Sequence, residues 1–152
     1  MKKNKPLVTI SITCKNYGKF LKKSLESVLN QTYKKIEIYV VDDNSEDQSK
    51  KILDSLKKKY PKINCIYNKK NLGLQKISNS IIKICNGKYF LRLDADDWLF
   101  KNTVKLMVES FELKKNIDAV YGNYNYVNES GKIIGYENNL NIIKKHIAPH
   151  GG

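Results

Sequence analysis

Strand-like and helix-like stretches alternate along the sequence, and this alternation restricts the chain to few fold classes. The strand-like stretches are rich in β-branched and aromatic residues and cover Val8–Ile12, Ile36–Val41, Ile63–Tyr67 and Tyr89–Leu93. Apolar residues recur at helical spacing after each of them, in Phe20–Leu29, Ile52–Tyr60, Leu74–Ile84 and Val104–Phe111. This order predicts an α/β fold: a mostly parallel, doubly wound (Rossmann-like) sheet with helices on both faces, connected by right-handed crossovers.

Local signals add detail to this plan. Ser45-x-x-Gln48 resembles a capping box, which predicts the start of the second helix, and Glu46 and Asp47 suit the positive end of a helix dipole. Two further strands, Ala119–Tyr126 and Ile133–Tyr136, are predicted on either side of a turn at residues 128–131. Since 152 residues is a usual domain length and no linker interrupts the pattern, we expect a single domain over 1–152.

The charge of the chain invites a nucleic-acid interpretation, which the residue types weaken. The sequence has 28 Lys and Arg against 15 Asp and Glu, a formal net charge of +13. Arg92 is the one arginine, whereas forked recognition of bases and phosphates favours arginine. We therefore expect lysines that solvate the surface and no nucleic-acid partner, with peripheral contact to an anionic membrane as their functional use.

Several classes of protein are excluded or disfavoured. No apolar run is long enough to span a bilayer, and the N-terminus lacks a signal-peptide pattern, so we expect a cytoplasmic address. The cysteines at 14, 65 and 85 are far apart and form no C-x-x-C pair, which indicates neither a disulfide framework nor a zinc ribbon. Neither G-x-G-x-x-G nor G-x-x-x-x-G-K-[ST] is present, which disfavours Rossmann dinucleotide and P-loop sites.

Polar residues follow the predicted strands at Thr13–Asn16, Asp42-Asp43 and Asp94–Asp97. Ligands of parallel sheets bind at the carboxyl ends of the strands, so function is expected there. Carboxylates that crowd together repel, and such a cluster normally needs a cation or a donor-rich ligand. Oxygen ligands suit Mg²⁺ or Mn²⁺, which bind through one or two carboxylates and substrate phosphates. The alternative, that Asp43 and Asp97 only cap the following helices, explains one acid per cluster.

The motifs at these positions resemble the family 2 glycosyltransferases, which have the GT-A fold. Residues 8–16 resemble the family's first strand and nucleotide loop, and residues 25–33 (LESVLNQTY) resemble its first-helix signature. Residues 40–45 (VVDDNS) are similar to its second-strand motif. The sequences NLGL at 71–74 and GKY at 87–89 precede LDADD at 93–97, which resembles the family's D-x-D region. Several motifs in the right order are more specific evidence than any one of them.

The resemblance implies a role for each strand end. Asp43 would accept a hydrogen bond from the base, uracil N3–H in a UDP-sugar, and Thr13, Lys15 and Asn16 would line the nucleotide pocket. The implied reaction transfers a sugar from a nucleotide-diphosphate sugar to an acceptor hydroxyl with inversion, in cell-surface polysaccharide synthesis. The implied acceptor is a saccharide or a lipid-linked saccharide at the inner membrane face.

The metal side of the implied site lies in the D-x-D region. Asp96 would be the main ligand of Mn²⁺ or Mg²⁺ through the diphosphate, and Asp94 would be a second metal ligand near the ribose or the donor sugar. Asp97 would support the loop or the sugar. A bound cation would neutralise charge on the departing diphosphate. Ser78 stands where many members have arginine, and Lys76 is the predicted substitute without the forked geometry.

The sequence departs from the family at two further places. Lys15 replaces an aromatic residue that stacks on the base in many members. Members continue beyond the equivalent of residues 149–152 into an acceptor-binding half that carries the catalytic base, so we expect that half to be missing here. The catalytic base stays unknown, since His146 and His150 are predicted to lie in a frayed tail and Glu129 and Glu137 to be solvated.

Three alternatives stay open beside the active transferase. The chain could be a non-catalytic fragment that binds nucleotide sugars without the base. A phosphoacceptor signalling domain also uses acids at strand ends, but its acidic pair is expected after the first strand, where Thr13-Cys14-Lys15-Asn16 stands. A basic nucleic-acid module would show steeply salt-dependent binding.

Overall fold

The computed structural model describes residues 5–114 and 116–137. By their internal contacts these residues divide into two compact units, and the boundary in the sequence falls between Asn102 and Thr103. The predicted single domain over 1–152 stays a prediction. No helix within the described residues is both long and apolar enough to cross a bilayer.

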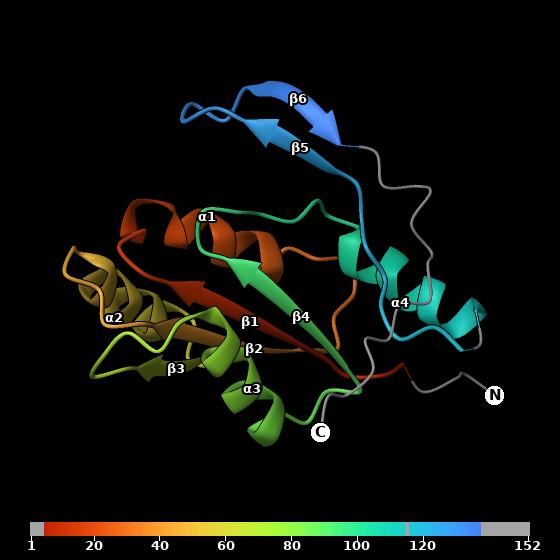
Figure 1. Cartoon of the computed structure of the whole chain (residues 1–152), viewed down its shortest axis with the longest axis horizontal. Coiled ribbons are helices and arrows are strands. Elements are labelled where there is room, and N and C mark those ends of the chain that lie inside the picture. The colour runs from red at the N-terminus through yellow and green to blue at the C-terminus, as the bar shows by residue number, and fades with distance from the viewer. Residues whose placement is uncertain (1–4, 115, 138–152) are drawn as a thin grey trace, which may run out of the picture. The chain divides into compact units, whose positions relative to one another are not determined.

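The first unit is built on a four-stranded parallel sheet in the order β3-β2-β1-β4 (Figure 1). The strands are β1 (Val8–Cys14), β2 (Ile36–Asp42), β3 (Asn64–Tyr67) and β4 (Tyr89–Asp94). Pairing is in register, with Val8 opposite Ile36 of β2 and Tyr89 of β4. All seven residues of β1 are buried, as expected for the central strand of a sheet covered on both faces. The predicted parallel α/β fold is confirmed.

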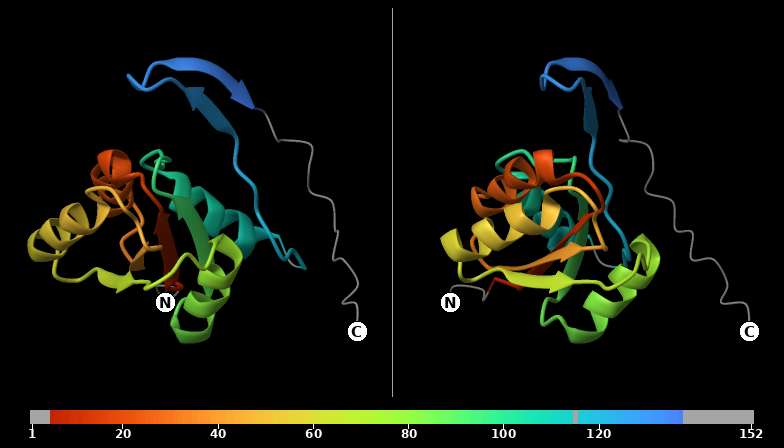
Figure 2. Two further views of the ribbon diagram at one scale, coloured as in Figure 1. Left: turned by 60° about the vertical axis from the view of Figure 1, so that its left-hand side comes forward. Right: turned by 90° about the vertical axis from the view of Figure 1, so that its left-hand side faces the viewer.

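Helices cover both faces of this sheet. The helices α1 (Gly18–Leu29) and α2 (Ser49–Lys59) lie on one face and α3 (Leu74–Ile84) on the other (Figure 2). The topology requires this arrangement: β1, β2 and β3 progress in one direction, whereas the connection from β3 to β4 runs back past them, and right-handed crossovers then place α3 opposite. On the α3 face, Ile77 and Ile81 pack against buried side chains of β2.

Gly87 explains how closely the loop before β4 approaches the central strand. A Cβ atom at this position would lie 2.3 Å from Thr9 Oγ1 and 2.6 Å from the Thr9 amide nitrogen. Its own amide donates a hydrogen bond to Thr9 Oγ1 at 3.1 Å. Glycine is therefore required sterically, because any side chain would push β4 away from β1.

The predicted capping box at the second helix is wrong. The helix begins at Ser49, and its N-cap residue Gln48 makes no side-chain cap hydrogen bond. Asp47 takes that role, since its carboxylate accepts the amide of Ser49 at 2.9 Å and the amide of Gly18 at 3.1 Å. One carboxylate thus accepts hydrogen bonds from the first turns of two helices. Burial by itself would raise the pKa of Asp47, but these hydrogen bonds outweigh it and lower the pKa.

The second unit contains α4 (Thr103–Leu113) and an antiparallel pair of strands, β5 (Tyr124–Val127) and β6 (Ile133–Glu137). The predicted turn at residues 128–131 is confirmed: the amide of Gly131 donates to the Asn128 carbonyl at 2.8 Å. The strand predicted at Ala119–Tyr126 is shorter and begins at Tyr124. His146 and His150 lie outside the described residues.

Candidate functional site

The strand ends of β1, β2 and β4 meet at one edge of the sheet. Thr13 is paired with Asp94 across β1 and β4, and the amide of Ala95 donates to the Thr13 carbonyl at 3.0 Å. On the other side, the amide of Asp43 donates to the Cys14 carbonyl at 2.8 Å. The two predicted acidic clusters therefore flank the end of β1, with Thr13 between them.

Three hydrogen-bond donors from the segment between β3 and α3 hold the Asp43 carboxylate. Its Oδ1 accepts from Asn68 Nδ2 at 2.8 Å and from the Leu72 amide at 2.9 Å, while Oδ2 accepts from the Gly73 amide at 2.9 Å. Burial by itself would raise the pKa of this carboxyl, but these hydrogen bonds and the charge of Lys15 outweigh it and lower the pKa. Asp43 is thus a buried, fixed anion at the N-terminus of α3.

Lys15 and Asn16 join the loop after β1 to the loop after β2. Lys15 Nζ donates to the Asn44 carbonyl, and the Asn16 amide donates to Ser45 Oγ at 2.9 Å. Asn16 Oδ1 accepts the Glu46 amide at 2.7 Å. Asn16 and Asn44 both have positive φ, near 60°, which asparagine tolerates better than most residues. These residues shape the rim beside Asp43.

The acidic cluster after β4 has far fewer partners. Asp94 Oδ1 is buried without a hydrogen-bond partner, and Oδ2 has Arg92 Nη2 at 3.3 Å. The pKa of Asp97 is raised, first by loss of solvation and then by the charges of Asp96 and Asp94. Asp96 is exposed. This end of the sheet concentrates negative charge, and Arg92 pairs with one of its carboxylates.

These residues fit a divalent cation that a ligand helps to hold. Among the described residues, no group of three or more His, Cys, Asp or Glu side chains is close enough to bind a metal ion alone. A magnesium or manganese ion needs only one or two carboxylates when phosphate oxygens complete its coordination. Such a cation would give the buried Asp94 oxygen a partner and would offset the repulsion that contributes to the raised pKa of Asp97.

Lys76 lies in the first turn of α3, whose N-cap residue Gly73 donates a hydrogen bond to Asp43. It is exposed on α3 and, within the described part of the chain, makes no hydrogen bond or ion pair with the other predicted residues. Sequence reasoning in turn assigned no role to Asn68, to the amides of Leu72 and Gly73, or to Arg92. The sequence NLGL, with Gly73 at φ +78° before a helix, was the available signal for this anion-binding turn.

A parallel sheet of this order with acidic residues at the ends of β2 and β4 is the N-terminal part of a GT-A fold. The profile of the family described as glycosyl transferase family 2 matches residues 9–149. The chain therefore belongs to glycosyl transferase family 2.

The chain is 33% identical over 132 residues to a chondroitin synthase of Escherichia coli, covering 87% of this chain and 19% of that protein. It is 29% identical over 143 residues to the glycosyltransferase GlyG of Streptococcus pneumoniae, covering 93% and 47%. The chain thus spans less than half the length of these relatives.

Solved structures give the same result. Residues 1–349 of S. aureus TarS in complex with UDP-GlcNAc match with a TM-score of 0.61 and 27% identity, over 70% of this chain and 31% of that one. The Pyrobaculum calidifontis mannosyltransferase PcManGT, in complex with GDP-Man and Mn²⁺, matches with a TM-score of 0.57 and 21% identity, over 63% and 29%. The second likeness shows the fold alone.

Proposed function

We propose that this chain is the donor-binding part of an inverting, metal-assisted glycosyltransferase that uses a UDP-sugar. The observation that carries the proposal is the placement of two unlike acidic groups on either side of Thr13: a fixed anion, Asp43, and an unbalanced cluster around Asp94. A nucleoside diphosphate has the matching chemistry, with N–H donors on its base and negative charge on its phosphates. TarS, a structural neighbour, binds UDP and UDP-GlcNAc.

The base would be read by Asp43. Its Oδ2 accepts a hydrogen bond from the Gly73 amide, and a carboxylate oxygen has capacity for a second donor. Uracil and guanine carry a ring N–H, whereas cytosine and adenine do not, and an ionised carboxylate can only accept. Thr13, Lys15 and Asn16 would line the same pocket, with Lys15 near enough to lower the pKa of Asp43. This arrangement favours UDP over CDP.

The diphosphate would lie toward Asp94 and Asp96. These two carboxylates would hold Mn²⁺ or Mg²⁺ together with the phosphates, and the cation would stabilise negative charge on the departing nucleotide. Arg92 holds one oxygen of Asp94 and leaves the other, buried oxygen for the ligand. Asp97 would support the loop, and Lys76 on α3 would approach the phosphates or the sugar.

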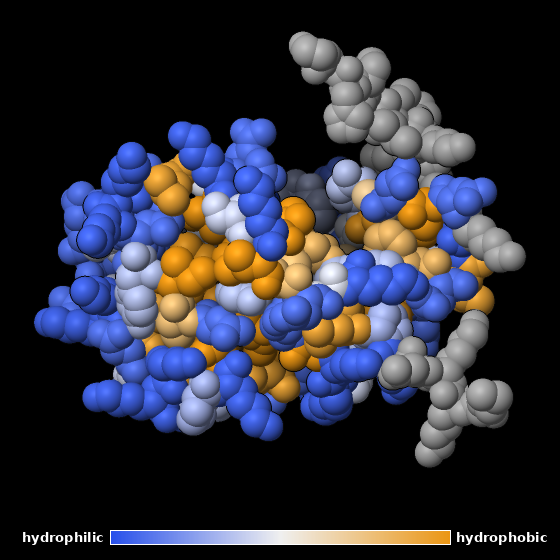
Figure 3. Space-filling model, turned by 90° about the horizontal axis from the view of Figure 1, so that it is seen from below, coloured by the Kyte–Doolittle hydropathy of each residue, from blue (hydrophilic) through white to orange (hydrophobic). Residues whose placement is uncertain are grey.

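The relatives support a proposal for the acceptor and the cellular setting. Because a relative is a chondroitin synthase, we place the reaction in cell-surface polysaccharide synthesis, on a saccharide or lipid-linked saccharide acceptor. Peripheral contact with an anionic inner membrane face is supported by α3, where exposed Leu74, Ile82 and Ile84 alternate with Lys76 and Lys83. Figure 3, seen from the α3 side, shows apolar side chains between hydrophilic ones.

The alternative is a chain that binds nucleotide sugars without transferring the sugar. The match covers 19% of the chondroitin synthase and 47% of GlyG, so the proposal concerns the donor-binding part alone. Release of UDP from UDP-GlcNAc in the presence of a saccharide acceptor would refute this alternative.

Calorimetry with UDP, CDP, GDP and ADP, each with Mn²⁺ and with a chelator, tests the proposal. We expect UDP to bind, CDP to bind at least about tenfold more weakly because cytosine has no ring N–H to donate to Asp43, and Mn²⁺ to strengthen UDP binding. A folded sample that binds none of the four nucleotides with Mn²⁺ present would overturn it.

A further inference from the structure

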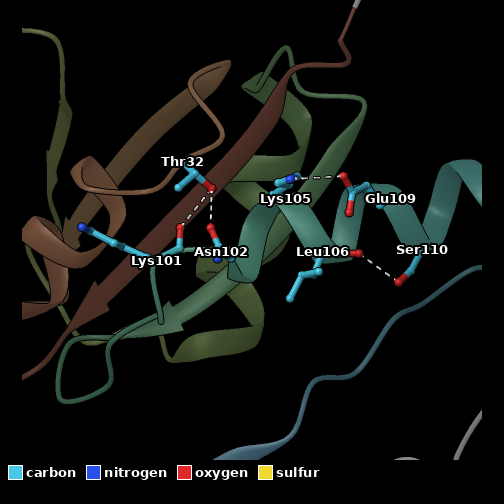
Figure 4. A network of polar contacts seen from close by, with 7 residues as sticks. All are labelled: Thr32, Lys101, Asn102, Lys105, Leu106, Glu109 and Ser110. Carbon is cyan, nitrogen blue, oxygen red and sulfur yellow. Dashed lines mark hydrogen bonds and ion pairs between the residues drawn. The ribbon is translucent and has the colours of Figure 1, made fainter.

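The loop that carries the acidic cluster is held along its length by polar groups of α1 and of the turn after it. The contacts are Ser24 Oγ to the Asp94 carbonyl (3.3 Å), the Leu99 amide to Ser27 Oγ (3.0 Å), Gln31 Nε2 to the Phe100 carbonyl (2.8 Å), the Thr32 amide to the Lys101 carbonyl (3.0 Å), and Thr32 Oγ1 to Asn102 Oδ1 (2.9 Å). Figure 4 shows Thr32 against Lys101 and Asn102, and separately the ion pair of Lys105 with Glu109 on α4.

The spacing of these residues follows the helix period. Ser24 and Ser27 are three residues apart and Gln31 follows four later, so one stripe of α1 and its end faces the loop. The contacts of Ser24, Ser27 and Gln31 engage backbone groups of the loop and none of its acidic side chains. The stripe therefore sets where the loop backbone runs and does not occupy the carboxylates.

Gln31 is the most demanding member of this stripe. It is fully buried, and its Nε2 donates both to the Phe100 carbonyl at 2.8 Å and to the Ser27 carbonyl at 3.0 Å. A buried amide between two backbone carbonyls is costly unless both bonds form, so its geometry is tightly determined. Ser27 acts similarly, since its hydroxyl donates to the Ser24 carbonyl and accepts the Leu99 amide.

The two ends of the acidic segment are thereby anchored. Ser24 holds the carbonyl of Asp94 and Ser27 holds the amide of Leu99, so Asp96 and Asp97 lie between two fixed points of the backbone. Lys23 Nζ also lies 3.2 Å from the centroid of the Trp98 ring. Asp94, Asp96 and Asp97 carry like charges close together in sequence, so without such anchors their repulsion would favour a more open loop.

We propose that Ser24, Ser27 and Gln31 are positioning residues that hold the Asp94–Asp97 segment in the geometry that binds a divalent cation with a nucleoside diphosphate. This inference rests on the proposed function and gives a role to the first-helix signature at residues 25–33. The three residues act through the loop backbone and touch neither the cation nor the nucleotide.

The test uses Trp98, which is the single tryptophan of the chain and lies in the loop itself. The wild-type protein, Gln31→Met, Ser27→Ala and the control Ser80→Ala are titrated with UDP, with Mn²⁺ and with a chelator, by calorimetry and by Trp98 fluorescence. Ser80→Ala is matched to Ser27→Ala: its hydroxyl also donates to a carbonyl of its own helix, that of Lys76, but makes no loop contact. Circular dichroism establishes that each variant is folded.

We expect Gln31→Met and Ser27→Ala to lose about tenfold or more of the Mn²⁺-dependent gain in UDP affinity, while UDP affinity in chelator stays at the wild-type value. The Mn²⁺-dependent change in Trp98 fluorescence should shrink in parallel, and Ser80→Ala should match wild type. An unchanged Mn²⁺-dependent gain in both variants overturns the inference, as does an equal loss with and without metal, which marks a purely structural role. Wild-type protein that shows UDP binding but no Mn²⁺ effect overturns the proposed metal role and this inference with it. Wild-type protein that binds no nucleotide refutes the proposed function by itself.

Discussion

Asp43, directly after β2, and Asp94, at the end of β4, carry the same carboxyl group but have different surroundings. Asp43 is buried among three donors, and its pKa is lowered. Asp94 keeps one buried oxygen without a partner, and its neighbour Asp97 has a raised pKa. The donors to Asp43 come from the segment between β3 and α3, which includes the backbone amides of Leu72 and Gly73, whereas the loop directly after β4 brings further acids next to Asp94.

The difference shows which half of the site is complete before a ligand arrives. An anion that three hydrogen bonds already hold in place loses little freedom when it accepts one more donor, so the Asp43 side is preorganised. A crowded acidic segment is stable only where its backbone is held, and it gains most from a cation. We therefore interpret the site as a finished base-recognition side and a cation-dependent phosphate side.

The largest expected effect is on the free energy of unfolding when Asp43 and Asp94 are each replaced by asparagine. Asp43→Asn turns a carboxylate oxygen into an amide donor that faces other donors, and we expect it to lower the free energy of unfolding by about 3 kcal/mol. Asp94→Asn gives up only an exposed contact to Arg92 while it relieves repulsion, so its change should stay below about 1 kcal/mol. Urea denaturation followed by circular dichroism measures both.

This pair of variants can break the comparison. If Asp94→Asn is as destabilising as Asp43→Asn, the β4 cluster has partners that stabilise it and the contrast is wrong. Asp54→Asn serves as the control, because its carboxylate meets only exposed groups such as the Tyr67 hydroxyl.

The next effect separates the two sides by metal dependence. Asp96→Ala should reduce Mn²⁺-dependent UDP binding about a hundredfold, since it removes the proposed main ligand, and leave binding in chelator unchanged. Asp43→Ala should weaken UDP binding in both conditions. Calorimetry with and without Mn²⁺ distinguishes the patterns, and an Asp96→Ala protein with full metal dependence would remove Asp96 from the site.

The repeating features of the fold could be predicted from the sequence, whereas long-range side-chain contacts could not. Helix α3 was predicted at Leu74–Ile84 and lies there, because its apolar period is unbroken and Asn86-Gly87 follows it. The meeting of Thr13, Asp43 and Asp94 at one edge followed from parallel topology alone.

The failures have a common physical cause. The start of α2 is set by Asp47, which also binds the amide of Gly18 across a different part of the chain. The partners of Asp43 come from a loop about 25 to 30 residues away, so no local pattern around Asp43 indicates that its pKa is lowered. The stripe of α1 that holds the acidic loop is equally non-local, with Gln31 and Phe100 separated by 69 residues.

The smallest expected effect concerns pH: the charges of Asp43 and Asp97 should change the free energy of unfolding in opposite directions as the pH rises. The folded pKa of Asp43 is lowered, so its contribution to stability is present above the ordinary aspartate pKa and is lost as the pH falls through the folded value. The folded pKa of Asp97 is raised, so the protein loses stability as the pH rises from the ordinary value through the folded one.

Asp97→Asn should therefore be more stable than wild type at neutral pH, by less than about 1 kcal/mol because the side chain is partly solvated, and equal to it in acid. Asp43→Asn should show the reverse trend, its deficit shrinking as the pH falls. Urea unfolding at a series of pH values measures both differences, and slopes of the same sign would mean that the two strand ends do not differ in the way their surroundings indicate.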